Sequence, residues 1–423
     1  MKFIDLFSGL GGFHYGLSKS GNYECVYAAE IDPELRQLYA DNYGITPDND
    51  ITKIAENEIP AHDIICAGFP CTSFSLAGKK SGTKCPRDGK LIDDVLRIAK
   101  YHNPDVVILE NVPKVLTIED GKFWKYIRYN FDKIGYKLKH KIISPTHFNI
   151  PQARPRLFII GFRDKTIMDN FHWPEPNIKY TVRKLTSLLA DKQKRIPLET
   201  PKQRQLKKWQ ALLNHVGRKA INSNSIMAPE FGASYPSNFK TLTLAKMRQY
   251  KGAYGVDLHD CTTWKEIMER MPAYTRNQRS VPKWMTPSLC YSRKLYKNHL
   301  KFLKKWAKDI NKKNNSWQVL EWRGYPDNVD MTNHLIQFRA SGIRVMKCEV
   351  APSLTAMTPT QIPIIGSDMG YMTKHEAARL QHLHNLPMLP HGTTKAFKAL
   401  GNAVNTKIVE SIGKNIATAL TRG

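Results

Sequence analysis

A chain of 423 residues is too long for one compact core, and its 41% hydrophobic and 24% charged residues exclude a disordered or fibrous protein. The formal net charge of +27, from 64 Lys and Arg against 37 Asp and Glu, indicates a polyanionic partner, because basic side chains displace counterions from phosphates. Seven cysteines without a C-x-x-C pair, no apolar run of roughly 18 residues and no signal-peptide pattern predict a reduced, cytoplasmic protein without a disulfide framework, a metal or a membrane span.

The first half of the chain alternates short apolar runs with helical periodicity, which is typical of a sheet with crossover helices. Five runs are predicted to be buried strands: 3–7, 25–29, 63–67, 106–109 and 156–160. In open α/β sheets ligands bind beyond the carboxyl ends of the strands. We therefore expect the chemistry of this protein in the residues that adjoin those runs.

A glycine-rich turn, residues 7–13, follows the first predicted strand and leads into a helix whose N-terminal amides can face a ligand. His14 stands where a dinucleotide fingerprint would have its third glycine, so a cofactor with a pyrophosphate is not favoured. Glu30, at the end of the second strand, can accept both hydroxyls of a ribose, and Asp50 follows the next segment. The two acids fit an adenosine-containing ligand, although each alone is as readily a helix N-cap or a surface residue.

The third predicted strand runs into a loop, residues 68–71, that glycine and proline constrain and that ends in Cys71. Most cysteines are buried fillers, but a thiol at a strand end can act as a nucleophile where nearby cations raise its thiolate fraction. Glu110 follows the fourth strand, and Arg154 and Arg156 introduce the fifth, two residues apart and hence on one face of an extended segment. These side chains would supply a nucleophile, an acid and an electrostatic clamp at one sheet edge.

From about residue 174 to about residue 365 the alternation gives way to Pro-, Asn- and Lys-rich stretches, which we predict to form a second domain. Residues 201–320 hold 24 Lys and Arg against 6 Asp and Glu, a net charge of +18, and are the candidate nucleic-acid face, with a solvated surface as the alternative. Thr373 before Glu376 predicts a capping box, and residues 403–420 have helical periodicity. We expect this last part of the chain to rejoin the first domain.

Six motifs occur in the order found in DNA cytosine-5 methyltransferases, which the chain resembles over residues 1–165 and 371–423, about half of its length. They are D-L-F-S-G-L-G-G from Asp5, G-F-P-C ending at Cys71, E-N-V from Glu110, Q-A-R-P-R from Gln152, E-A-A-R-L-Q from Glu376 and G-N-A-V from Gly401. The resemblance, to enzymes of the bacterial restriction-modification type, implies an α/β fold with the Rossmann-like sheet of S-adenosylmethionine-dependent methyltransferases. It implies a catalytic and cofactor-binding domain over 1–175, a smaller, basic target-recognition domain over 176–367, and a C-terminal segment, 368–423, that returns to the catalytic domain.

The resemblance further implies that Cys71 adds to C6 of a cytosine flipped out of double-stranded DNA, and that C5 then receives a methyl group from S-adenosylmethionine. Glu110 would hold or protonate cytosine N3, a role that favours a raised pKa. Arg156, and with it Arg154, would bind the cytosine carbonyl oxygen and a nearby phosphate. These four residues are the predicted catalytic set.

By the same resemblance, Phe7 stacks on the cofactor adenine, Glu30 binds its ribose, Asp50 contacts its amino group, and Leu91 and Asn402 line the pocket. The full predicted cofactor-binding set is Phe7, Gly9, Gly11, Gly12, Phe13, Glu30, Asp50, Pro70, Leu91 and Asn402. Residues 79–90 would close over DNA. The residue that fills the gap left by the flipped base stays open, because Ala77 stands where some relatives carry serine.

Arg and Gln can bond two atoms of a guanine or adenine edge, so the sequence predicts a set of DNA-contacting residues, with structural packing as the alternative. The set is Arg87, Arg323, Gln337, Arg339 and Arg344. The family implies a monomer that acts on DNA in the cytoplasm of a bacterial or phage-infected cell, with a cognate restriction endonuclease that it does not contact.

Two other functions are weighed against this prediction. A transfer-RNA cytosine-5 methyltransferase keeps the same motifs but should need less of the long basic middle segment. A catalytically inactive DNA-binding relative is disfavoured by the intact set of Cys71, Glu110, Arg154 and Arg156.

Overall fold

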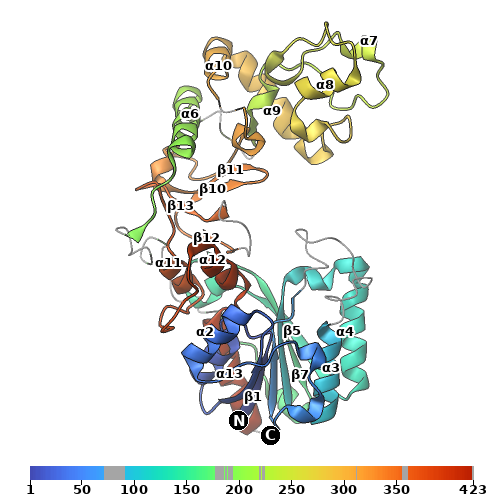
Figure 1. Ribbon diagram of the computed structural model, residues 1–423, viewed down its shortest axis with the longest axis vertical. Helices are drawn as coiled ribbons and strands as arrows, with labels where there is room; N and C mark the ends of the chain where they lie inside the picture. Colours follow the sequence, from blue (N-terminus) through green and yellow to red (C-terminus); the bar gives the residue numbers. More distant parts are fainter. Residues whose placement is uncertain are drawn as a thin grey trace. The chain divides into compact units, whose positions relative to one another are not determined.

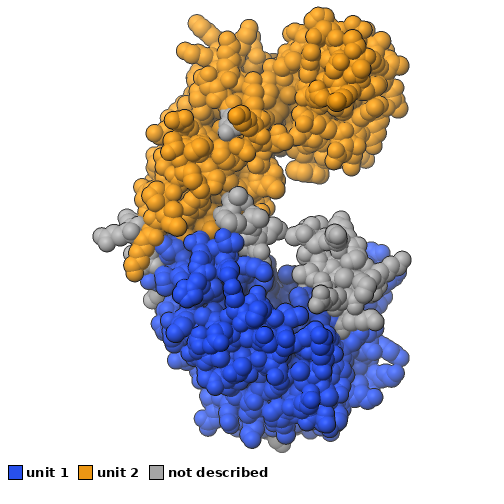
Figure 2. Space-filling model, in the orientation of Figure 1, with its two compact units in different colours: residues 1–191, 349–359, 373–423 blue, residues 192–348, 360–372 orange. Residues whose placement is uncertain are grey.

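A computed structural model describes residues 1–70, 91–176, 185, 188, 194–218, 221, 224–310, 312–354 and 361–421. The chain divides into two compact units (Figure 2). Unit 1 comprises residues 1–191, 349–359 and 373–423, and unit 2 comprises residues 192–348 and 360–372. Among the described residues, none of the helices has the length and apolar character that crossing a membrane requires.

Unit 1 is built on a six-stranded sheet with the strand order β2-β1-β3-β4-β7-β5. Figure 1 shows this sheet together with helices of the unit. The strands are β1 (Lys2–Leu6), β2 (Glu24–Ala29), β3 (Ile64–Ala67), β4 (Val106–Asn111), β5 (Lys137–Ile143) and β7 (Arg156–Phe162). Strands β1 to β4 are parallel, whereas β7 is antiparallel to its neighbours β4 and β5. Every residue of β4 is buried, as expected of a strand covered by helices on both faces.

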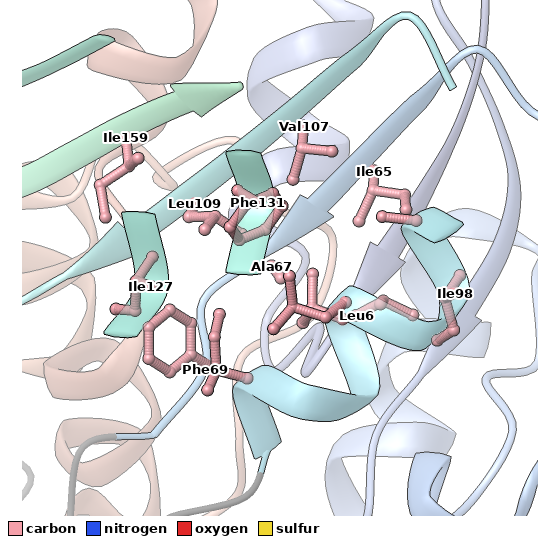
Figure 3. Close-up of a cluster of buried hydrophobic side chains, with 14 of the residues drawn as sticks. Leu6, Ile65, Ala67, Phe69, Ile98, Val107, Leu109, Ile127, Phe131 and Ile159 are labelled. Atoms are coloured by element: carbon pink, nitrogen blue, oxygen red, sulfur yellow. The ribbon is translucent and has the colours of Figure 1, made fainter. Parts of the chain in front are cut away.

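Helices cover the two faces of this sheet and bury two hydrophobic clusters. Figure 3 shows one cluster, in which Leu6, Val107 and Leu109 of the sheet lie beside Ile98 of α3 and Ile127 of α4. The other cluster joins α1 and α13 to the opposite face. The helices of unit 1 are α1 (Gly12–Ser18), α2 (Pro33–Tyr43), α3 (Leu91–His102), α4 (Lys122–Lys133), α5 (Lys165–Asn170), α11 (Lys374–Leu380), α12 (Thr393–Asn402) and α13 (Thr406–Thr421).

All five strands predicted from the sequence are present, each within two residues of its expected limits. The predicted α/β class with a Rossmann-like sheet is confirmed. The capping box of Thr373 and Glu376 is also present at the start of α11. The edge strand β5 was not predicted, because its K-L-K-H-K-I-I sequence lacks a buried apolar run and only its last residue, Ile143, is buried.

The predicted domain limits, 1–175, 176–367 and 368–423, differ from the two units in three places: residues 176–191 belong to unit 1, residues 368–372 belong to unit 2, and one internal segment changes unit. Residues 349–359, expected in the second domain, belong to unit 1. The reason is a two-stranded parallel pair formed by β6 (Gln152–Ala153) and β12 (Ala351–Pro352), supported by a hydrogen bond from Ala351 N to Pro151 O of 2.8 Å. A strand of two residues leaves no periodic signal in the sequence.

Unit 2 contains a second six-stranded sheet with the order β14-β13-β10-β11-β9-β8. Its strands are β8 (Ile226–Met227), β9 (Val319–Arg323), β10 (His334–Arg339), β11 (Gly342–Lys347), β13 (Ile364–Ile365) and β14 (Gly370–Tyr371). Its helices are α6 (Thr200–Val216), α7 (Leu244–Met247), α8 (Trp264–Arg270), α9 (Thr286–Asn298) and α10 (Leu300–Trp306). One face of the sheet packs against α6 and α10 in a core that contains Trp209, Trp306 and Ile336.

Candidate active site and cofactor cradle

Polar side chains gather where the parallel strands of unit 1 end. Glu110 is the penultimate residue of β4, and Arg156 is the first residue of β7. Because β7 is antiparallel to β4, with Glu110 opposite Phe158, the beginning of β7 lies at the same edge as the end of β4. This strand direction explains why an arginine at the beginning of one strand can pair with an acid near the end of another.

Glu110 and Arg156 form an ion pair, with Arg156 Nε 3.1 Å from Glu110 Oε1. Glu110 is only 7% exposed. The contact is ionic only, since Oε1 has no aligned hydrogen-bond donor among the described residues. Burial raises the pKa of Glu110, and the charges of Arg156 and Arg154 offset only part of that rise. This carboxyl therefore keeps a proton at a higher pH than an ordinary glutamic acid.

Arg154, 1% exposed, is held inside the protein by other parts of the chain. Its terminal nitrogens donate hydrogen bonds to Ser353 Oγ (3.3 Å) and to the carbonyl oxygens of Leu354 (2.9 Å), Gly401 (2.8 Å) and Ala403 (3.0 Å). Burial, together with the charge of Arg156, lowers the pKa of Arg154 to about 9. The direct substrate contact that the sequence predicted for Arg154 does not fit these bonds, because both terminal nitrogens already have protein acceptors. These bonds join residues 353–354 and 401–403 to the segment that precedes β7.

Asn111 connects the end of β4 to the loop that follows β3. Its Nδ2 donates to the carbonyl oxygen of Phe69 at 3.0 Å, and its Oδ1 accepts from Val112 N at 2.8 Å. Phe69 lies two residues before Cys71 in the sequence. Asn111 was absent from the predicted site, although it directly follows Glu110 in the E-N-V motif. Cys71, Ala77, Arg87 and the predicted loop over 79–90 lie outside the described residues.

The glycine turn after β1 is tied to the end of β2 through Glu30. Gly9 N donates to Glu30 Oε2 at 2.8 Å, and Asp32 N donates to Oε1 at 2.9 Å. Burial raises the pKa of Glu30, although these backbone hydrogen bonds partly offset the rise. Phe7 has a φ of 57°, a left-handed conformation that is uncommon outside glycine and is concentrated at functional sites.

At two glycine positions in the turn, neighbouring residues leave no room for a side chain. Gly11 has a φ of 70°, and a Cβ there would lie 2.4 Å from the Tyr43 ring. A Cβ on Gly12 would lie 2.5 Å from Val404, so the C-terminal segment packs directly beside the turn. Ser8 Oγ is buried without a hydrogen-bond partner among the described residues. An adenosine-bearing ligand fits this cradle, which offers a carboxylate fixed by backbone amides and a buried polar atom still able to form a hydrogen bond.

The other predicted cofactor-binding residues have varied surroundings. Phe13 is 3% exposed and packs in the hydrophobic core with Val404. Asp50 caps a short 3-10 helix by accepting from Thr52 N at 3.2 Å, the N-cap alternative weighed from the sequence. Leu91 begins α3, and Pro70 and Asn402 are exposed. No cluster of metal-ligating side chains occurs in the part of the chain that the structure describes.

In unit 2, four of the predicted DNA-contacting residues lie on one face of the sheet. Gln337 on β10 pairs with Arg344 on β11, which pairs with Glu321 on β9. Arg339 and Arg323 are each two positions along from a member of this row and therefore share its face. Gln337 is 8% exposed and donates to Gln361 O at 2.8 Å, so its amide is already in use within the fold.

Glu321, which the sequence analysis did not identify, is the centre of this face. Its Oε1 accepts from Arg323 Nε at 3.1 Å, and its Oε2 accepts from Arg344 Nε at 2.8 Å. Arg339 Nη1 lies 3.8 Å from Oε2. The only signal in the sequence is an acid two residues before Arg323, which places both side chains on one face of a strand.

Comparison with known proteins places these features in context. The family model for C-5 cytosine-specific DNA methylases matches residues 1–418. The Type II methyltransferase M.DsaV of Dactylococcopsis salina is 32% identical over 291 residues, which cover 64% of this chain and 82% of that relative. M.MspI of Moraxella is 41% identical over 175 residues, 41% of each chain. M.HhaI of Haemophilus parahaemolyticus is 39% identical over 176 residues, 42% of this chain and 53% of the relative. The alignments with M.MspI and M.HhaI thus span about half of those proteins or less.

Two solved structures share the fold over nearly their whole length. One, described as a DNA modification methyltransferase encoded within an E. coli prophage, has a TM-score of 0.55 at 16% identity, covering 100% of this chain and 99% of its own. The other, the Entamoeba histolytica methyltransferase EhMeth, has a TM-score of 0.51 at 13% identity, covering 99% of this chain and 98% of its own. At these identities the likeness concerns the fold.

Proposed function

Because the chain belongs to the C-5 cytosine-specific DNA methylase family, we propose that it transfers a methyl group from S-adenosylmethionine to C5 of cytosine at a specific site in double-stranded DNA. The family predicted from the six motifs is confirmed by the match over residues 1–418. Similarity to Type II methyltransferases supports a restriction-modification setting, in which a cognate endonuclease cuts the unmethylated site without contacting this enzyme.

The order of residues along one sheet edge carries the proposal. From β2 through β1, β3, β4 and β7, the residues at or just beyond this edge are Glu30, Phe7, Phe69, Glu110 and Arg156. Cys71 follows Phe69 by two residues in the sequence, and Phe69 follows β3, the strand that lies between the cofactor cradle and the acid. A methyl donor bound at β1 and β2 and a base held at β4 and β7 would approach each other across that strand.

The chemistry requires a nucleophile because cytosine C5 is a weak nucleophile until a group adds at C6. The thiolate of Cys71 forms the S–C6 bond, and C5 then carries the electron pair that accepts the methyl group. Loss of the C5 proton and breakage of the S–C6 bond return the ring to aromaticity and the thiolate to the enzyme. The base must leave the helical stack for this reaction, at a cost of a few kcal/mol.

Glu110 would stabilise the negative charge that develops on the cytosine ring. Its raised pKa suits a carboxyl that shares a proton with cytosine N3 as the thiolate adds. Arg156 pairs with Glu110 and would also bind the cytosine carbonyl oxygen. Bound S-adenosylmethionine would supply the methyl group, with S-adenosylhomocysteine as the leaving product, and Glu30 would hold the cofactor's ribose. The hydrogen bond from Asn111 to Phe69 O fixes the backbone that leads to Cys71.

The first experiment incubates the protein with duplex DNA and S-adenosylmethionine and identifies the product by mass spectrometry of the digested DNA. We expect 5-methylcytosine, and bisulfite sequencing then gives its sequence context. Cys71→Ser should retain DNA binding and lose transfer, and duplex DNA with 5-fluorocytosine should become covalently attached to the wild-type enzyme. Transfer by the serine variant, or absence of the adduct, would contradict the covalent mechanism.

The same assay distinguishes the alternatives. Methylation of transfer RNA but not of duplex DNA would identify an RNA methyltransferase. Binding of duplex DNA without any transfer would identify an inactive relative. The proposal also includes a monomeric enzyme that acts on DNA in the cytoplasm, with unit 2 as its target-recognition domain and Arg323, Arg339 and Arg344 as its base-contacting side chains.

A further inference from the structure

We propose that Glu321 is a specificity-determining residue, which holds the arginines of β9 and β11 so that their terminal nitrogens recognise guanine in the DNA site. The inference rests on the proposed function in one respect, that unit 2 contacts DNA. It adds a residue and a base identity to that role.

The register makes this face polar. Along β9, β10 and β11, alternate residues such as Trp322, Ile336 and Val345 enter the core against α6. The residues between them, which include Glu321, Arg339 and Arg344, point to the opposite face. The three arginine side chains on this face are 31% to 53% exposed and Glu321 is 17% exposed, so the acid is the most buried member of the ionic cluster.

The hydrogen bonds orient the guanidinium groups. Arg323 and Arg344 each use Nε, the nitrogen nearest the side-chain stem, to bond one carboxylate oxygen of Glu321. These bonds leave the terminal nitrogens of both guanidinium groups available to other acceptors. Two terminal N–H groups in one plane match the O6 and N7 acceptors of guanine in the major groove. The bonds to Glu321 also restrict side-chain rotation before DNA binds, which lowers the entropic cost of recognition.

The charge of the face is unbalanced. One carboxylate faces three guanidinium groups, which leaves a net charge of +2 if all four are ionised, from Glu321, Arg323, Arg339 and Arg344. Arg339 Nη1 is buried with no hydrogen-bond partner among the described residues. The excess positive charge on these partly exposed arginine side chains favours a partner that is rich in acceptors and negative charge, and the base edges and phosphates of DNA provide both.

The experiment selects bound sequences from a random duplex library with the full-length protein and compares wild type with Glu321→Gln. This substitution keeps the side-chain volume and removes the charge. Wild type should enrich a motif that contains guanine. The variant should lose its preference at one or more of those guanines. Discrimination is the Kd for a duplex with that guanine replaced, divided by the Kd for the selected duplex, and it should fall about 5- to 150-fold. Its affinity for unrelated duplex should stay unchanged or increase, because the variant carries one negative charge fewer.

Two further variants separate positioning from folding and from charge. Arg344→Lys keeps the positive charge and removes the two-pronged guanidinium group. It should weaken the preference for guanine at a position where Glu321→Gln also weakens it. Glu269→Gln makes the same charge change at an exposed residue of unit 2 and should leave the motif intact. An unaltered motif in the Glu321 variant, or an equal loss of affinity for all duplexes, would overturn the inference. Because selection measures binding alone, a protein that selects a motif but transfers no methyl group would refute the proposed function and leave this inference standing.

Discussion

Two glutamate–arginine clusters in this chain have opposite electrostatic outcomes. In unit 1, burial raises the pKa of Glu110, and the charges of Arg156 and Arg154 do not fully offset it. In unit 2, burial acts on Glu321 in the same direction, but hydrogen bonds from Arg344 and Arg323 and their charges lower its pKa below the ordinary value. The number of aligned arginine donors therefore decides whether a carboxyl can carry a proton or stays a fixed anion.

The largest expected effect tests the first half of this comparison. Glu110→Gln removes the proton-carrying carboxyl and keeps its shape. General acid–base contributions of about 10²- to 10⁴-fold set the expected loss in the single-turnover rate of methyl transfer. Duplex binding should be retained, because Glu110 lies on the catalytic edge and not on the face of unit 2. A rate within threefold or so of wild type would show that the carboxyl does not participate in proton transfer.

The same substitution should have the opposite effect on stability. The pKa of Glu110 in the folded protein lies above its ordinary value of 4.5, so ionisation of this carboxyl costs folding free energy. The cost is present above the folded pKa and absent below the ordinary one. Glu110→Gln should therefore raise the urea midpoint of unfolding at pH 8 and leave it unchanged at pH 4. A lower midpoint at pH 8 would mean that the ion pair with Arg156 outweighs burial.

Arg154→Lys separates the two arginines of the catalytic edge. Lysine cannot reach the acceptors that the two terminal nitrogens of Arg154 bond, so buried carbonyl groups lose their donors. We expect a loss of about 2–4 kcal/mol in the free energy of unfolding, measured in urea at neutral pH. Arg128→Lys, an exposed position on α4, is the matched control and should change stability little. An Arg154 variant that unfolds like wild type but transfers no methyl group would restore the catalytic role first predicted for it.

How much of the catalytic edge could be predicted depends on how local its signals are. Five of the six strands in the main sheet of unit 1, and the placement of Glu110, follow from short apolar runs that end in polar residues. The bonds of Arg154 could not be predicted, because its acceptors lie 199 to 249 residues away in sequence. Phe13 belongs to a predicted cofactor motif, yet its burial depends on the distant helix α13.

The recognition face was harder to predict for a related reason. Arg323 and Arg344 were chosen singly, for the chemistry of their side chains. Their common face requires the parallel pairing of β9 with β11, across the β10–β11 hairpin, and this pairing is not visible in a linear pattern. Glu321 was missed because an acid in a basic segment resembles ordinary surface charge. Gln337 shared the right face, but its buried amide bonds Gln361.

Asn111→Ala should lower kcat, and its free-energy effect should be smaller than that of Glu110→Gln on the rate or of Arg154→Lys on stability. It removes the hydrogen bond to Phe69 O and so loosens the backbone two residues before Cys71. A displacement of that loop by about 1 Å can cost up to about 100-fold in rate, and we expect roughly a tenfold loss of kcat. The Kd for duplex DNA should stay as in wild type, because unit 2 is unchanged. A normal kcat would show that Asn111 stabilises the turn after β4 without positioning the nucleophile loop.

The smallest effect concerns four exposed lysines of unit 2, two on α9 (Lys294 and Lys297) and two on α10 (Lys301 and Lys304). The nearby acid Asp309 pairs with Lys208 at 2.9 Å and so neutralises a lysine of α6. Replacing all four lysines with Gln should lower the slope of log K against log salt by about one for each lysine that contacts a phosphate, and leave the selected motif unchanged. Glu321→Gln should do the reverse, changing the motif with the slope preserved. An unchanged slope would mean that the lysines are only solvated, and DNA recognition would then rest on the face around Glu321.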